Sequence, residues 1–267
     1  MPQNGNVFGY KWFLNNVTKD WDALVEGDYE SVFPLTWQKN IWGSKVLQQP
    51  ILARELGIYS IHLLSAKRIA AFLDRIPNEY KKATLAFNEQ ILPVQHANKD
   101  WKKQPNYQLF LQEDYSLLRE KYDAQLLTAL STPHAGLNTN FSLKPERLAD
   151  FFNLHSQEKN KTLKYHALLR IMYNALHRGL GFAAGVSDEK DNLLAVGFFI
   201  YGHGKLLNLA SAVSKEGKHI NAFEILLDLI IQSNAGRPLV FDFNSNDKQY
   251  AWFGALPNHF YEWHHKF

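Results

Sequence analysis

Alternation of hydrophobic and polar positions predicts a strand pair near the N-terminus. The segments WDALV (21–25) and YESVFPL (29–35) alternate in this way and flank a turn that contains Gly27. Two such segments around a short Gly-containing turn are typical of an antiparallel hairpin. A third short strand, KVLQQ, is predicted to begin at Lys45.

A helix and one more strand follow this hairpin. The segment 65–76, SAKRIAAFLDRI, has helical spacing of its apolar residues, and Ser65 is placed to cap its N-terminus. The apolar segment KATLAFN (82–88) then predicts a strand. The N-terminal part therefore has the order hairpin, strand, helix, strand.

The C-terminal part repeats the same order at nearly equal spacing. Its segments are the hairpin GFAAGV and LLAVGFFIY around the turn 187–191, the strand KLLNLASAV (205–213), the helix 219–231 and the strand PLVFDFN (238–244). Five elements in the same order favour an internal duplication. The alternative is that both parts adopt a common α+β arrangement independently.

Further segments lie before and between these repeats. They are a strand at 106–112, a helix at 113–130, a linker at 131–140, and helices at 145–152 and 163–179. We therefore predict an α+β protein of two tandem units, residues 1–130 and 131–267, each a mixed or antiparallel sheet flanked by helices.

Composition narrows the class of protein. The chain of 267 residues has no cysteine, which excludes disulfides and thiol chemistry, and its formal charge of +3 is too small to indicate nucleic-acid binding by itself. No signal peptide precedes the first predicted elements, and no apolar run is long enough to span a bilayer. A cytoplasmic protein without membrane insertion is the expectation.

The element order resembles the GNAT acyltransferase fold, and its doubling resembles the Fem family, whose members carry two GNAT-like units. The segments WDALVEGDYESVFPLTWQKN (21–40), QQP (48–50) and ELGIYS (55–60) are similar to an uncharacterised bacterial group of GNAT/Fem-like proteins. The resemblance covers nearly the whole chain. It implies two units that share a central cleft and transfer an acyl group to an amine.

The resemblance also implies where a donor binds. In GNAT enzymes the pantetheine of acyl-CoA lies along the strand before the main helix, here Leu206–Val213. The pyrophosphate lies on the next turn and helix N-terminus, here Ser214–Ala222, where backbone N–H groups form an anion site. The predicted donor-binding residues are Ala212, Val213, Lys215, Gly217, Lys218, His219, Asn221 and Ala222.

This segment departs from the usual pattern of the GNAT phosphate loop. Gly217 and Ala222 are five positions apart, whereas the (Arg/Gln)-x-x-Gly-x-(Gly/Ala) pattern places its two small residues two apart. A basic solvated turn before a buried helix is the alternative interpretation. Acyl-CoA is accordingly expected as a donor substrate and not as a tightly bound cofactor.

Tyr250 occupies a position that carries chemistry in GNAT enzymes. It stands four residues before Gly254 in YAWFGA, and a tyrosine at that place in the family protonates the leaving thiolate. A phenol can return a proton to such a group. The alternative is a packing tyrosine on a short amphipathic helix.

Carboxylates supply the other candidates. Asp242 lies in an apolar strand, where an ionised group needs a partner, so it is either a catalytic base facing a cleft or a structural pair. Glu224 and Asp228 are spaced i, i+4 on the main helix, and a solvated helix face accounts for them. No histidine or carboxylate cluster has metal-ligand spacing, so no metal is expected.

Known Fem enzymes take amino acids from aminoacyl-tRNA and attach them to peptidoglycan precursors, which makes aminoacyl-tRNA the alternative donor. The basic runs 101–103 and 159–164 could contact RNA phosphates, although solvated lysines are the commoner explanation. The predicted function is acyl or aminoacyl transfer to a small-molecule or peptide amine. The alternative is a non-catalytic binding or scaffold protein that keeps the fold.

Overall fold

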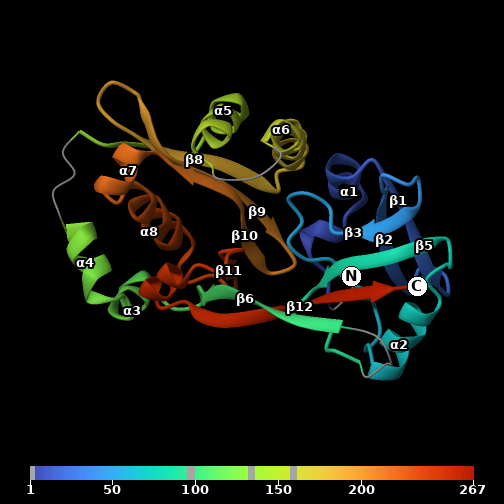
Figure 1. The fold of residues 1–267 in the computed structure, drawn as a ribbon. Helices are drawn as coiled ribbons and strands as arrows, with labels where there is room; N and C mark the ends of the chain where they lie inside the picture. The colour runs from blue at the N-terminus through green and yellow to red at the C-terminus, as the bar shows by residue number, and fades with distance from the viewer. Residues whose placement is uncertain (1–3, 95–99, 132–135, 157–160) are drawn as a thin grey trace. The chain divides into compact units, whose positions relative to one another are not determined.

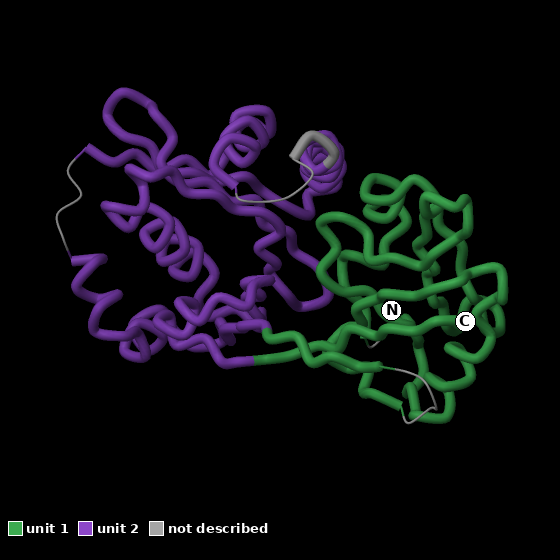
Figure 2. The backbone as a smooth tube through the Cα atoms, in the orientation of Figure 1, with its two compact units in different colours: residues 1–105, 258–267 green, residues 106–257 purple. Residues whose placement is uncertain are grey.

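The computed structural model describes residues 4–94, 100–131, 136–156 and 161–267. These residues form two compact units (Figure 2). Unit 1 comprises Met1–Pro105 together with Asn258–Phe267, and unit 2 comprises Asn106–Pro257. Each unit has its own hydrophobic core.

Unit 1 begins with helices and continues as a twisted sheet (Figure 1). Its elements are the 3-10 helix η1 (Val7–Gly9), α1 (Lys11–Val17), β1 (Asp20–Glu26), β2 (Ser31–Lys39), β3 (Lys45–Gln48), β4 (Tyr59–Ser60), α2 (Ala66–Asp74), β5 (Tyr80–Phe87) and the end of β12 (Leu256–Lys266). The strand order is β1-β2-β3-β5-β12, with β4 beside β2.

The predicted elements of unit 1 are confirmed. β1 and β2 form the antiparallel hairpin, β3 adds antiparallel to β2, and β5 lies parallel to β3. Ser65 caps α2, because its hydroxyl oxygen accepts a hydrogen bond from Arg68 N at 3.3 Å. The helix packs Ile69, Phe72 and Leu73 into the core of this unit.

Unit 2 repeats this plan with more helices. Its elements are the end of β6 (Asp100–Phe110), α3 (Tyr115–Glu120), α4 (Ala124–Ser131), β7 (Asn138–Asn140), α5 (Pro145–His155), α6 (Lys161–His177), β8 (Gly181–Ser187), β9 (Leu193–Gly202), β10 (Lys205–Val213), α7 (Lys215–His219), α8 (Ala222–Asn234), β11 (Val240–Asp242) and the 3-10 helix η2 (Lys248–Phe253). The strand order is β7-β8-β9-β10-β11-β6.

The strands of the two units have the same topology, as the duplication predicts. In unit 2, β8 and β9 form the hairpin, β10 lies antiparallel to β9, and β11 lies parallel to β10. In Figure 1, α8 covers one face of this sheet, and α5 and α6 cover the other. The predicted α+β class is thus confirmed.

The limits of the units differ from the predicted division between residues 130 and 131. β6 crosses from unit 1 to unit 2 and pairs with β11, while β12 crosses back from unit 2 and pairs with β5. The segment after β6 also belongs to unit 2, because Leu109, Leu118 and Leu126 are buried in its core. Local patterning does not reveal such long-range strand pairing.

Two predicted helices are divided in the structure. The helix expected at 113–130 is α3 and α4, separated where Asp123 N donates to Trp252 O at 2.8 Å. The helix expected at 219–231 begins only at Ala222. His219 is the last residue of α7, and Asn221, with φ of 54°, separates α7 from α8. A left-handed residue cannot continue a right-handed helix.

Candidate active site in unit 2

The sheet of unit 2 divides where β10 and β11 separate. Their parallel pairing covers only Lys205–Leu207 and Val240–Asp242, although β10 continues beside β9 as far as Val213. Within the described residues, no strand pairs with this side of β10 beyond Leu207. Every second peptide group of a strand points to the same side, so residues 208–213 present N–H and C=O groups along an open edge.

The corresponding fork of unit 1 is closed by its own chain. Gln49 N donates to Thr84 O at 3.0 Å, and Gln49 Oε1 accepts from Ala86 N at 2.9 Å. Leu56 N donates to Ala86 O at 2.6 Å, and its carbonyl accepts from Asn88 N at 2.7 Å. The segment after β3 therefore fills the fork of unit 1 by pairing with the edge of β5.

Tyr250 lies next to the open fork of unit 2. It belongs to η2, which Asp247 caps through its side chain and which Gly254 ends with φ of 74°. The half-buried ring of Tyr250 stacks on Phe243, with centroids 4.4 Å apart and planes at 26°. Phe243 is the first residue after β11, so this stack stands where the two strands part. The role of Tyr250 as proton donor stays a prediction.

The side chain of Asp242 is held by four partners. Its Oδ1 accepts from Asn106 Nδ2 and from the backbone N of Asn244, both at 2.9 Å. Its Oδ2 accepts from Gln108 Nε2 at 2.9 Å and lies 3.5 Å from Lys205 Nζ. Asp242 is only 4% exposed. This geometry favours the structural alternative, because both carboxylate oxygens are engaged and buried.

The predicted donor-phosphate segment is compact and capped at its start. Ser214 Oγ accepts from Gly217 N at 2.9 Å and caps the short helix α7. Gly217 is buried, and a Cβ at its position would lie 2.2 Å from Leu194 O. Its missing side chain therefore allows α7 to pack on β9. The glycine was expected to let the backbone approach a phosphate, but here it lets the backbone approach β9.

The other predicted donor residues lie around the start of α8. Asn221 is the residue before this helix, and its side chain does not accept a hydrogen bond from the first N–H groups of α8. Ala212 and Ala222 are buried, Val213 and Asn221 are half-buried, and Lys215, Lys218 and His219 are exposed. Positive side chains and a helix N-terminus thus lie beyond the end of the open edge.

Glu224 is a titratable group that the sequence argument treated only as part of a solvated face. It is half-buried in the first turn of α8, and burial together with the nearby Asp247 raises the pKa of its carboxyl. Asp247, whose charge acts on Glu224, also accepts a hydrogen bond through its backbone carbonyl from Tyr250 N at 3.3 Å. Glu224 and the aromatic stack therefore share Asp247 as a neighbour. A raised pKa suits a carboxylate to accept a proton.

The expectation of a solvated face is wrong for Asp228. Its carboxylate is buried and accepts the hydroxyls of Tyr115 at 2.8 Å and Tyr122 at 3.0 Å. Burial, with the adjacent carboxylate, raises the pKa of Tyr115 to about 12. These hydrogen bonds hold α8 against the segment of α3. The sequence alone does not show that α3 packs next to Asp228, so it could not predict the burial of this carboxylate.

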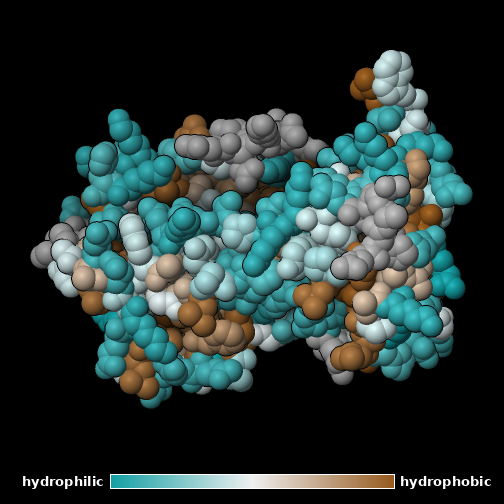
Figure 3. Space-filling view, turned by 60° about the horizontal axis from the view of Figure 1, so that its bottom comes forward, coloured by the Kyte–Doolittle hydropathy of each residue, from teal (hydrophilic) through white to brown (hydrophobic). Residues whose placement is uncertain are grey.

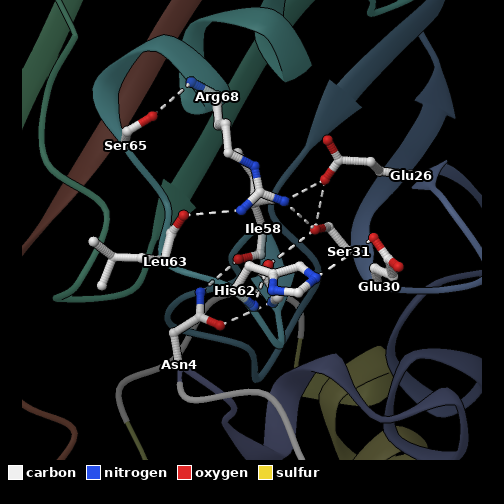
Figure 4. A network of polar contacts seen from close by, with 10 residues as sticks. Asn4, Glu26, Glu30, Ser31, Ile58, His62, Leu63, Ser65 and Arg68 are labelled. Atoms are coloured by element: carbon white, nitrogen blue, oxygen red, sulfur yellow. Dashed lines mark hydrogen bonds and ion pairs between the residues drawn. The ribbon is translucent and has the colours of Figure 1, made fainter.

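Unit 1 contains a polar cluster of a different kind (Figure 4). Arg68, from α2, points to Glu26 and to Ser31 Oγ at 2.9 Å, and it also donates to Leu63 O at 2.8 Å. The hydrogen bond from Arg68 lowers the pKa of the Glu26 carboxyl. These groups satisfy one another, so the cluster has the character of a structural link between α2 and the first hairpin.

Hydrophobic residues are interspersed with hydrophilic ones on the face drawn in Figure 3. The described residues contain no group of three or more histidines and carboxylates that could hold a metal ion. Across the same residues, no helix combines the length and apolar character needed to cross a membrane. The basic run at 159–164 lies partly outside the described residues.

Comparison with solved structures shows a Fem-type fold. FemX matches with a TM-score of 0.64 at 9% identity, over 97% of this chain and 92% of that chain. L-PGS from Bacillus licheniformis matches with a TM-score of 0.56 at 12% identity, over 100% and 94%. A conserved protein of unknown function from Bacteroides thetaiotaomicron matches at 0.59 and 9%, over 96% and 88%. No protein-family model and no curated protein matches the sequence.

These similarities confirm the predicted resemblance in fold. FemX and L-PGS match over nearly their whole length and over nearly the whole of this chain. At 9 to 12% identity the likeness concerns the fold and carries no residue roles. The assignment of chemistry therefore depends on the geometry of the fork in unit 2.

The role of Gly217 can be tested by Gly217→Ala. The added Cβ would meet the backbone carbonyl of Leu194, so we expect the free energy of unfolding to fall by about 1–3 kcal/mol. Urea denaturation would measure this change. Lys218→Ala, on the exposed side of the same helix, is the control and should change stability by less than about 0.5 kcal/mol. An unchanged stability of Gly217→Ala would mean that α7 does not pack on β9 in this way.

Asp242→Asn tests the carboxylate network. The substitution replaces one carboxylate oxygen by an NH2 group, which would face the amide donor of Asn106 or of Gln108, and it removes the negative charge beside Lys205, so we expect a loss of about 2–3 kcal/mol. The matched control is Asp191→Asn. This exposed carboxylate forms an ion pair with Arg147, so its loss should lower the free energy of unfolding by at most about 1 kcal/mol. Equal effects of the two substitutions on urea denaturation would contradict the structural role of Asp242.

Proposed function

We propose that unit 2 transfers an acyl or aminoacyl group from acyl-CoA or aminoacyl-tRNA to an amine acceptor. The observation that carries this proposal is the open fork between β10 and β11 beside the Phe243–Tyr250 stack. The filled fork of unit 1 supports the assignment of the donor to unit 2 alone.

The open edge suits an extended donor. Ala210, Ser211 and Ala212 have small side chains, which leave room for a chain to lie along the backbone of β10. An extended ligand with amide groups can hydrogen-bond to such an edge as an added strand does. Beyond the edge, the N-terminus of α8 and the exposed Lys215 suit phosphate groups, which both donor classes carry.

The chemistry requires one bond to form and one to break. The amine nitrogen attacks the acyl carbon, a C–N bond forms, and the C–S bond of a thioester or the C–O bond of an aminoacyl ester breaks. The leaving sulfur or oxygen takes a proton from the hydroxyl of Tyr250. The amine gives up its proton, for which Glu224 with its raised pKa is the candidate acceptor.

A non-catalytic binding protein is the second candidate. It is favoured by Gly217, whose backbone packs against Leu194 where a phosphate loop would present a free glycine. Such a protein would bind a ligand at the fork without turnover. The two candidates differ in whether the donor bond is broken.

A donor screen tests the proposed function. Acyl-CoAs would be incubated with the protein and a panel of primary amines, and released thiol would be measured with a thiol-reactive dye. The chain has no cysteine, so the protein itself adds no background to this assay. Labelled aminoacyl-tRNAs would be tested by loss of label from the RNA. Ligand binding without any amine-dependent cleavage would favour the binding protein.

Tyr250→Phe is expected to reduce turnover about 100-fold, the usual contribution of a positioned proton donor. The phenyl ring keeps its stack on Phe243, so stability should fall by no more than about 1 kcal/mol. Tyr201→Phe is the matched control in the same unit. It removes a hydroxyl that donates to Asn234 Oδ1 at 2.9 Å and should leave turnover unchanged. Full activity of Tyr250→Phe in the donor assay would remove this tyrosine from the mechanism.

A further inference from the structure

Asn208 is a buried amide with an unused hydrogen-bond acceptor. Its side chain is 4% exposed on β10, and its Nδ2 donates to Ser211 Oγ at 3.3 Å. Its Oδ1 is buried and has no hydrogen-bond partner among the described residues. An unsatisfied buried acceptor costs roughly 1–3 kcal/mol, so a side chain that serves only folding would not favour this arrangement.

Asn208 stands at the point where the two strands separate. Leu207 and Asp242 are the last residues of β10 and β11 that pair, and Asn208 and Phe243 follow them directly. The peptide groups that begin the open edge are therefore those of Asn208. The unused oxygen lies at the fork and not elsewhere in the core.

The side chain of Asn208 lies on the same face of the sheet as Tyr250. Asn208 pairs with Phe199 across β10 and β9, and directly paired residues point to the same face. A row of aromatic rings leads from Phe199 to Tyr250. The ring centroids of Phe199 and Phe241 are 6.0 Å apart, and those of Phe241 and Phe243 are 4.5 Å apart. Phe243 then stacks on Tyr250. The polar atom and the proton donor thus share one side of the fork.

We propose that Asn208 Oδ1 accepts a hydrogen bond from the N–H of the acceptor amine and positions it for attack. This inference rests on the proposed transfer reaction and names its substrate as an amine with a free N–H. An oxygen with unused lone pairs needs a donor. The acyl carbonyl and the phosphates of either donor offer only acceptors, and the amide N–H groups of an acyl-CoA would be used along the backbone of residues 209–213. A primary amine offers N–H groups at the fork itself and retains a lone pair for the acyl carbon.

Binding of the amine can be measured without turnover. The protein would be labelled with 15N-asparagine, and the side-chain amide signals of Asn208 would be assigned by their loss in Asn208→Leu. Ethanolamine is the probe, and choline is the matched control, because it carries a similar positive charge without any N–H. We expect ethanolamine to shift the Asn208 signals and choline to leave them unchanged.

Two results of this titration would overturn the proposal. Equal shifts with both compounds would mean that charge and not an N–H is recognised. No shift with ethanolamine would mean that the free end of the amide does not serve amines. The latter is also the result expected if the amide were turned the other way, with its NH2 group facing the ligand.

Kinetics of Asn208→Leu separate a positioning role from a structural one. Leucine has a similar volume and removes the unsatisfied acceptor, so we expect the melting temperature to be unchanged or higher. The KM for the amine should rise about 10-fold, the effect of one lost hydrogen bond, while the KM for the donor stays the same. A lower melting temperature with both KM values unchanged would show that Asn208 serves the fold alone.

A second variant covers the case in which leucine does not fit. Asn208→Ala also removes the oxygen, and the same rise in the KM for the amine is expected. The outcomes also distinguish the two proposals of this structure. Turnover with a normal KM in both variants refutes the role of Asn208 and leaves the transferase, whereas an N–H-dependent NMR shift in a protein without turnover supports the amine site and refutes the transferase.

Discussion

The carboxylate of Asp242 ties together the strands at the point where two of them separate. It holds Asn106 and Gln108 of β6 on one side and Lys205 of β10 on the other. Directly after it, Phe243 N donates to Tyr107 O at 3.1 Å, so the chain stays with β6 and leaves β10. The open edge, the aromatic stack and the unused oxygen of Asn208 all depend on this divergence.

The two units show how one topology can be open in one copy and closed in the other. Both contain a hairpin, a third strand and a parallel fourth strand. In unit 1 the chain after β3 returns to β5 through Gln49 and Leu56, whereas in unit 2 the chain after β10 enters α7. Buried or half-buried backbone groups need partners, so the open edge of unit 2 is a place where a ligand gains hydrogen bonds at little cost in reorganisation.

Most elements could be predicted from the sequence, because their signals are local. The apolar segment 205–213 and the cap at Ser65 predict β10 and α2 with nearly the bounds observed. The unit limits could not be predicted, because the pairing of β6 with β11 joins residues far apart in the chain. The left-handed conformation of Asn221 could not be predicted with certainty either, because asparagine adopts it more readily than most residues but also occurs within helices.

The candidate site was predictable only in part, for the same reason. The YAWFGA segment indicates Tyr250, and the structure places it beside the fork that the fold resemblance implies. A glycine at 217 indicates a close backbone approach, but only the structure shows that the approaching group is Leu194 O. An asparagine within LLNLASAV gives no sign that its oxygen lacks a partner, because that depends on which groups the fold brings next to it.

Hydrogen exchange tests the central claim most directly, namely that the open edge of β10 is the donor site. Amide exchange would be followed at residue resolution with and without saturating acyl-CoA, with binding verified by calorimetry. The account predicts slower exchange at 208–213 and at the first turn of α8, and no change at 49–56, where unit 1 closes its own fork. Unchanged exchange at 208–213 in protein that has bound the donor would contradict it.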